Sequence, residues 1–144
     1  ATVLGNIYTR QYYGKDTLKS DIRDRKRWKF KKVTKEPHLY EKHKTSPHKG
    51  YDSNYAGSSF MLLALVNELK KNNISEEEAF ELVFREIWVQ RSKQPYGSRG
   101  WKDAFEKSFG MNVEDFYQRL SKYKRKDLKN ILPSKTLRIQ DIFS

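Results

Sequence analysis

One apolar stretch limits what this chain can fold into. Every residue from Phe60 to Val66 is apolar, and Leu69 extends the pattern. A helix of this composition is apolar on all sides rather than along one stripe, so other elements must cover it completely. It is too short to cross a bilayer, which requires about 20 apolar residues. We therefore expect a central helix surrounded by other helices.

Helical spacing of apolar residues recurs on both sides of this stretch. Residues 2–13 carry an apolar face that Gly14 can end, and residues from Leu18 can form a second helix. Ser75 and Glu78 have capping-box spacing and open a helix with a well-defined inward face: Phe80, Val83, Phe84, Ile87 and Trp88. Two more helices follow, one capped by Ser98 and ended by Gly110, and one capped by Asn112.

These patterns predict an all-α fold, a compact orthogonal bundle of about five to six helices around the central apolar helix. A chain of 144 residues is long enough to bury one core. We expect a single helical domain over residues 1–144. Its parts are N-terminal helices with a basic run (1–33), a long irregular basic loop (about 34–54), a helical core (55–132) and an extended docking tail (133–144).

The first residue is Ala1, and Val3, Leu4 and Ile7 already follow a helical spacing. We expect a fragment of a longer chain, so that a motif upstream of Ala1 would not be visible. No signal peptide or transmembrane segment is visible, which favours a soluble chain and leaves its compartment open. The absence of cysteine excludes disulfides and thiolate metal sites.

Charge suggests one possible function. The formal net charge is +12, and residues 1–54 hold 14 Lys and Arg against 6 Asp and Glu. From Arg27 to Lys31 cations alternate with aromatic residues, which predicts an extended segment. Phosphate neutralisation combined with base stacking is how proteins bind single-stranded nucleic acid. The candidate residues are Arg25, Lys26, Arg27, Trp28, Lys29, Phe30, Lys31 and Lys32, supported by the basic stretch 122–129. Alternatively, Trp28 and Phe30 anchor this segment to the core while the lysines keep it solvated.

No complete catalytic motif is present. The chain lacks His-Glu-x-x-His, a glycine-rich phosphate loop and a nucleophile elbow. His38, His43 and His48 lie at five-residue intervals in the predicted loop, a spacing that does not make ligands converge, so no metal ligand is assigned. Glu68 and Glu86 lie beside apolar faces and are interpreted as rim residues.

The order of features over residues 51–123 resembles the C-terminal helical part of gluzincin-type zinc metallopeptidases, the group that includes peptidase MA-like proteins. Those chains carry a tyrosine, a small residue about three positions later and a long apolar helix, which here are Tyr55, Ser58 and the stretch 60–69. They also carry a helix that ends in an aromatic-glycine pair before an acidic helix start, here Phe109-Gly110 and then Glu114-Asp115. Two features depart from the family: the zinc-binding helix is missing, and Ser58 stands where glycine is usual.

The resemblance implies a role for one tyrosine. In that family the tyrosine at the start of this helix donates a hydrogen bond to the oxyanion of the tetrahedral intermediate. Tyr55 inherits this role, with Tyr51 as the nearby alternative. The chain would then form one wall of a peptide-hydrolase site and be inactive by itself. Zinc, the peptide substrate and the N-terminal remainder of the same chain would be its implied cofactor and partners. Alternatively, Tyr55 is an aromatic residue that packs on the core.

Three interpretations therefore remain open. The first is the helical C-terminal part of a metallopeptidase-like protein. The second is a small basic helical module that binds nucleic acid or another polyanion through Arg25 to Lys32. The third is a protein-interaction scaffold that uses its C-terminal tail.

Overall fold

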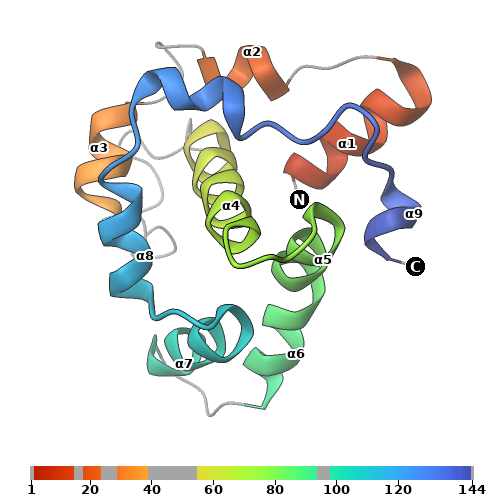
Figure 1. Ribbon diagram of the computed structural model, residues 1–144. Coiled ribbons are helices and arrows are strands. Elements are labelled where there is room, and N and C mark those ends of the chain that lie inside the picture. The colour runs from red at the N-terminus through yellow and green to blue at the C-terminus, as the bar shows by residue number, and fades with distance from the viewer. Residues whose placement is uncertain (1, 15–17, 24–28, 39–54, 94–97, 144) are drawn as a thin grey trace.

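Helix α4, Tyr55–Lys70, runs through the middle of the molecule (Figure 1). The structure is a computed structural model that describes residues 2–14, 18–23, 29–38, 55–93 and 98–143. Along α4, Phe60, Leu63, Ala64 and Leu69 are completely buried. The expectation of a central helix covered by its neighbours is confirmed.

The other elements form a ring around α4 (Figure 1). Helix α4 contacts α1, α2, α3, α5 and α8 directly. All regular structure in the described residues is helical, which confirms the all-α prediction. Around α4, the elements in chain order are α1 Thr2–Tyr13, α2 Leu18–Arg23, α3 Phe30–Lys35, α5 Glu76–Glu81, the π-helical segment η2 Leu82–Glu86, α6 Ile87–Ser92, α7 Ser98–Phe109, α8 Val113–Leu120, the 3₁₀ segment η3 Arg125–Asn130 and α9 Ile139–Ile142.

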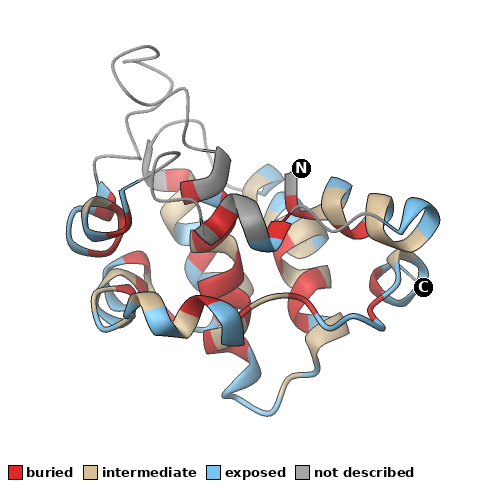
Figure 2. Cartoon of the chain, turned by 90° about the horizontal axis from the view of Figure 1, so that it is seen from above, coloured by how far each residue is buried: buried red, intermediate tan, exposed pale blue. Residues whose placement is uncertain are grey.

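A single cluster of buried apolar side chains joins these elements. Phe60 of α4 lies near its centre, with the Phe30 ring centroid 5.3 Å away and the Tyr123 ring centroid 6.0 Å away. Figure 2 shows buried residues on the inward sides of the helices and exposed residues on their outer sides. Burial of this apolar surface is the main favourable term in folding.

Helix ends follow the predicted signals. The Ser75 hydroxyl accepts a hydrogen bond from the Glu78 amide at 3.1 Å, and the Asn112 side-chain oxygen accepts one from the Asp115 amide at 2.7 Å. Each satisfies an amide that has no partner inside its helix. Gly14 and Gly110 follow α1 and α7 with φ of 69° and 70°, a region that favours glycine.

Trp88 was predicted on the inward face of its helix, and this is wrong: Trp88 is 69% exposed. The helix passes through the π-helical segment η2 between α5 and α6. A π turn holds more residues than an α turn. Each extra residue rotates the directions of all later side chains about the helix axis by about 100°. Phe80 and Val83 precede or enter this segment and are buried, whereas Trp88 lies beyond it and is turned outward.

The predicted extended segment and the predicted basic loop each need one corrected boundary. Phe30–Lys35 forms helix α3, so Phe30 and Lys31 are helical rather than part of the extended segment predicted from Arg27 to Lys31, and Thr34 and Lys35 are helical rather than part of the loop. The reason is burial: Phe30, Val33 and Thr34 occupy one face of α3 against the core. Within the predicted loop of about 34–54, residues 39–54 lie outside the described residues.

The C-terminal tail docks on the body as expected, but it is not wholly extended, because Ile139–Ile142 forms the short helix α9. The Arg10 guanidinium donates to the carbonyl of Ser134 at 2.7 Å, and the Ile139 amide donates to the Gln11 side-chain oxygen at 2.9 Å. Ile142 is completely buried. These contacts with α1 hold α9 against the bundle.

The two glycines Gly110 and Gly5 should respond oppositely to alanine. At neither position would an added Cβ meet a heavy atom within 4 Å, so space does not decide the outcome. Gly110→Ala strains a left-handed residue and should lower the free energy of unfolding by about 1 kcal/mol. Gly5→Ala lies inside α1 and should raise it by about 0.5–1 kcal/mol. Urea unfolding of both variants measures this, and a shift of the same sign in both would contradict the assignment.

Candidate functional site

The tyrosines singled out by the metallopeptidase resemblance lie at or before the start of α4. Tyr55 is the first residue of this helix, and its side chain lies outside the described residues, as does Tyr51. Just after Tyr55, Gly57 and Ser59 are buried and Ser58 is exposed. Gly57 and Ser59 therefore face the body of the protein, whereas Ser58 faces solvent.

The predicted polyanion-binding run is divided by the structure. Arg25, Lys26, Arg27 and Trp28 lie outside the described residues. Lys29 and Lys31 are exposed and Lys32 is half-buried. Phe30 is only 7% exposed and packs on Phe60, so its ring is not a surface on which a base can stack. For Phe30 the alternative interpretation, an anchor to the core, is the correct one.

The two basic stretches of the sequence lie side by side. The Lys35 ammonium donates to the Ser121 carbonyl at 2.6 Å, and the Arg125 guanidinium lies 5.7 Å from the centre of the Phe30 ring. Helix α3 also contacts α8 directly, as Figure 1 shows. We call the exposed lysines of these two stretches the basic surface: Lys29, Lys31, Lys35, Lys122, Lys124, Lys126 and Lys129.

Glu68 is the most unusual polar residue of the core. It belongs to the apolar helix α4 and is only 4% exposed. Its Oε2 atom accepts hydrogen bonds from the Tyr123 hydroxyl at 2.6 Å and from the Lys71 ammonium at 2.8 Å. The Arg119 guanidinium lies 3.7 Å from its Oε1 atom. The Asn67 amide donates to the Tyr123 hydroxyl at 2.8 Å and completes the network.

This network explains the protonation of its members. Burial acts to raise the pKa of the Glu68 carboxyl. Hydrogen bonds from Lys71 and Tyr123, with the charges of Lys71 and Arg119, outweigh burial, and the pKa lies below its ordinary value of 4.5. Burial and the bond to Glu68 raise the pKa of the Tyr123 phenol well above its ordinary value. Near pH 7 the carboxyl is ionised and the phenol protonated, so neither is suited to general acid-base catalysis.

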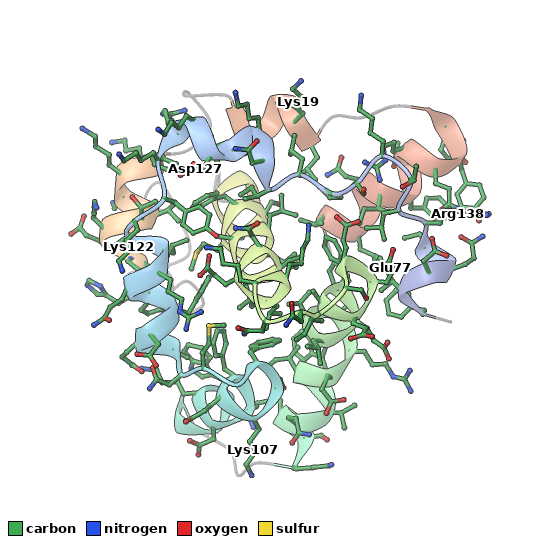
Figure 3. The ribbon with its side chains drawn as sticks, viewed as in Figure 1. Lys19, Glu77, Lys107, Lys122, Asp127 and Arg138 are labelled. Carbon is green, nitrogen blue, oxygen red and sulfur yellow. The ribbon has the colours of Figure 1, made fainter. Side chains whose placement is uncertain are left out.

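A pocket of about 460 Å³ opens beside this network. Its walls come from the last turns of α4, the end of α8 and the η3 segment. Figure 3 shows Lys122 and Asp127 at the left of the molecule, on the side of α8 and η3. The lining residues are Asn67, Glu68, Lys71, Arg119, Lys122, Tyr123, Asp127, Asn130 and Ile131. The arrangement suits binding of a polar, charged ligand rather than catalysis by proton transfer.

Sequence reasoning missed this site because it interpreted Glu68 as a rim residue. One local signal was present, since Lys71 follows Glu68 at a distance of one helical turn. The partner that matters most, Tyr123, is 55 residues away in the chain. No periodicity in the sequence connects these two positions.

In the described parts of the chain, no group of three or more His, Cys, Asp or Glu side chains is arranged to hold a metal ion. His38 is exposed, and His43 and His48 lie outside the described residues. None of the helices among the described residues is both long and apolar enough to cross a membrane.

Comparisons with protein-family models, with curated proteins and with solved structures gave no match. The metallopeptidase resemblance therefore depends on the residues that carry it, and the pocket beside Glu68 is interpreted from its own chemistry.

Glu68→Gln should destabilise the protein at neutral pH and much less in acid. Because the pKa of Glu68 is lowered on folding, its contribution is fully present above the unfolded-state pKa and is lost as the pH falls through the folded-state value. We expect the wild type to be about 1–3 kcal/mol more stable than the variant at pH 7, the range for hydrogen bonds to a buried charged group. The difference should shrink steadily below the ordinary pKa of 4.5, where a protonated Glu68 resembles glutamine.

Urea unfolding of both proteins across this pH range measures the effect. Glu106→Gln, which changes an exposed carboxyl on α7, is the matched control and should differ little from the wild type at any pH. A stability difference for Glu68→Gln that does not depend on pH would contradict the assigned charge state.

Proposed function

We propose that this chain is the helical part of a metallopeptidase-like protein and forms one wall of a peptide-hydrolase site. The observation that carries the proposal is the start of α4. The central helix begins at Tyr55, the residue to which the resemblance gives a hydrogen bond to the reaction's oxyanion. A phenol is a neutral donor near pH 7, and a single donor aimed at developing charge contributes about 2.7–4 kcal/mol to catalysis.

The helices that follow also support the proposal. Helix α7 ends at Phe109, Gly110 takes the left-handed conformation, and Asn112 caps α8. Glu114 and Asp115 then lie in the first turn of α8, where the resemblance requires an acidic helix start. Zinc and its ligands would come from an N-terminal segment with a His-Glu-x-x-His helix, which would also be the immediate partner of this domain. By itself the domain would not hydrolyse peptides.

Tyr55→Phe tests the proposed role in the protein that carries both segments. Loss of the hydroxyl should lower kcat about 10²–10³-fold and leave the zinc content unchanged, because the change removes a donor and not a metal ligand. Peptide hydrolysis with zinc analysis measures both quantities. Tyr13→Phe, at an exposed position of α1, is the matched control and should retain full activity.

Tyr51→Phe identifies the alternative donor, since a loss of kcat there and not at Tyr55 would assign the role to Tyr51. Two results would contradict the proposal. One is a coding sequence that starts directly before Ala1, and the other is full activity of both the Tyr55 and Tyr51 variants.

A second candidate function is polyanion binding, and a specific observation favours it. Two basic stretches that are distant in the chain form one basic surface, held together by the bond from Lys35 to Ser121, 86 positions apart, and by Arg125 over Phe30. Asp127 is the one acidic residue of η3, and it is engaged, since its carboxylate accepts from the Lys124 amide at 2.7 Å. Because Phe30 is buried, this binding would use phosphate neutralisation more than base stacking.

Four substitutions on the basic surface should weaken binding of a single-stranded oligonucleotide and flatten its dependence on salt. Each lost phosphate contact should reduce the slope of log K against log salt by about 0.7. Fluorescence anisotropy at several salt concentrations measures both effects. The test variant changes Lys29, Lys31, Lys122 and Lys126 to glutamine, and the matched control makes the same change at four exposed lysines elsewhere: Lys70, Lys93, Lys107 and Lys135. Equal losses in the two variants would show that net charge, not this surface, attracts the oligonucleotide.

A further inference from the structure

The pocket beside Glu68 is distinct from the proposed peptide-hydrolase wall. Its α4 residues lie in the last turns of that helix, whereas Tyr55 is the first residue. Thirteen residues separate Tyr55 from Glu68, which corresponds to about 20 Å along a helix that rises 1.5 Å per residue. A ligand in this pocket would therefore not contact the start of α4, and the pocket requires its own explanation.

The charges that line the pocket are not balanced. Three cations, Lys71, Arg119 and Lys122, face two carboxylates, Glu68 and Asp127. Both carboxylates already have partners. Glu68 is bound by Lys71 and by the Tyr123 hydroxyl, and Asp127 accepts from a backbone amide of its own segment. An excess of positive charge is thus left at the end of α8.

Arg119 and Lys122 carry this excess. The Arg119 guanidinium is 3.7 Å from the Glu68 carboxylate, too long for a hydrogen bond, and the residue is 43% exposed. Lys122 is exposed one turn later in the chain. Among the described residues, neither side chain is fixed by a hydrogen bond in the network around Glu68, so their donors can turn toward a ligand. Lys71, on the opposite wall, uses one of its three donors for Glu68.

The pKa of Glu68 reflects the electrostatic potential at the floor of the pocket. A carboxylate that is almost completely buried should be harder to ionise than in water. Hydrogen bonds from Lys71 and from the neutral Tyr123 hydroxyl, together with the charges of Lys71 and Arg119, nevertheless lower its pKa, so these groups stabilise negative charge at the floor of the pocket by more than burial disfavours it. Lys122 adds a further exposed cation to the lining of the same pocket.

We propose that this pocket binds a phosphate group, with Arg119 and Lys122 as the residues that contact its oxygens. A tetrahedral phosphate can accept from cations on both walls at once, and a guanidinium can bind two of its oxygens together. The volume of about 460 Å³ leaves room for an organic group attached to the phosphate, which Asn67, Asn130 and Ile131 would contact. The phosphate can belong to a small ester or to the backbone of a nucleic acid that lies along the basic surface. The inference is independent of the peptide-hydrolase proposal.

Titration with inorganic phosphate and with adenosine monophosphate, followed by two-dimensional NMR and calorimetry, tests the pocket directly. Chloride at matched ionic strength separates phosphate binding from salt effects. We expect shifts of the Tyr123 and Arg119 resonances with phosphate and not with chloride. Arg119→Gln and Lys122→Gln should each weaken binding about tenfold, equivalent to about 1.4 kcal/mol. Lys107→Gln, an exposed lysine on α7, should leave binding unchanged (Figure 3).

The circular dichroism spectrum and thermal midpoint of each variant establish that it is folded. Arg119 and Lys122 are both exposed, so we expect both variants to remain folded, although Arg119→Gln also removes the 3.7 Å ion pair with Glu68. The inference is overturned if phosphate shifts no pocket resonance, if chloride has the same effect, or if Arg119→Gln and Lys122→Gln bind phosphate as the wild type does.

A third titration with a single-stranded oligonucleotide distinguishes the two sources of phosphate. Binding that depends on Arg119 and that inorganic phosphate reverses would support a phosphate of the polymer backbone as the occupant. Binding of adenosine monophosphate without binding of the oligonucleotide would support a small ester. That outcome would reject the polyanion function while the pocket assignment stands.

Discussion

Complete burial of α4 is the constraint on which the rest of this structure depends. A helix that is apolar on every side cannot leave any face in water, so it must be surrounded rather than packed on one side. The chain meets this requirement with short helices from both of its ends, from α1 to α9, which contact one apolar cluster. Even the four-residue helix α9, which packs on α1 and α5, contributes a completely buried isoleucine, Ile142, to this cluster.

The same constraint decides where polar chemistry can occur. The middle of α4 is covered mainly by apolar neighbours, although the Tyr123 hydroxyl lies 3.3 Å from the Ala64 carbonyl oxygen, so functional side chains on this helix are expected toward its two ends. At the first end is Tyr55, and near the other is Glu68. Glu68 is tolerated in the core because two hydrogen bonds and a nearby guanidinium compensate its charge. Loss of these contacts would leave the buried charge of Glu68 uncompensated, at a cost in stability. This cost favours a fixed position of Tyr123 and of the end of α8 beside α4.

Features that depend on contacts within about one helical turn could be predicted from the sequence. Features that depend on contacts between distant segments could not. Ser75, Asn112 and Gly110 mark helix ends through contacts no more than four residues away, so their roles were visible. For Phe30 an extended segment was predicted, and base stacking and anchoring to the core both stayed open, because its partner Phe60 is distant in the chain. Trp88 was predicted to face inward because a regular 3.6-residue period was assumed through a segment that is π-helical. The pocket was missed for the same reason as the burial of Phe30, since Glu68 and Tyr123 are 55 positions apart in the chain.

The two proposed sites make different demands on the same helix. A peptide-hydrolase wall at Tyr55 requires a second segment that supplies a metal, whereas the pocket at Glu68 needs only residues of this chain. The bundle keeps them about 20 Å apart on one rigid element, so occupation of one need not alter the other. Electrostatics links them only weakly, because the screening length in physiological salt is about 8 Å. The basic surface adjoins the pocket through Lys122, which lines it, so phosphate chemistry is expected at the Glu68 end of the helix.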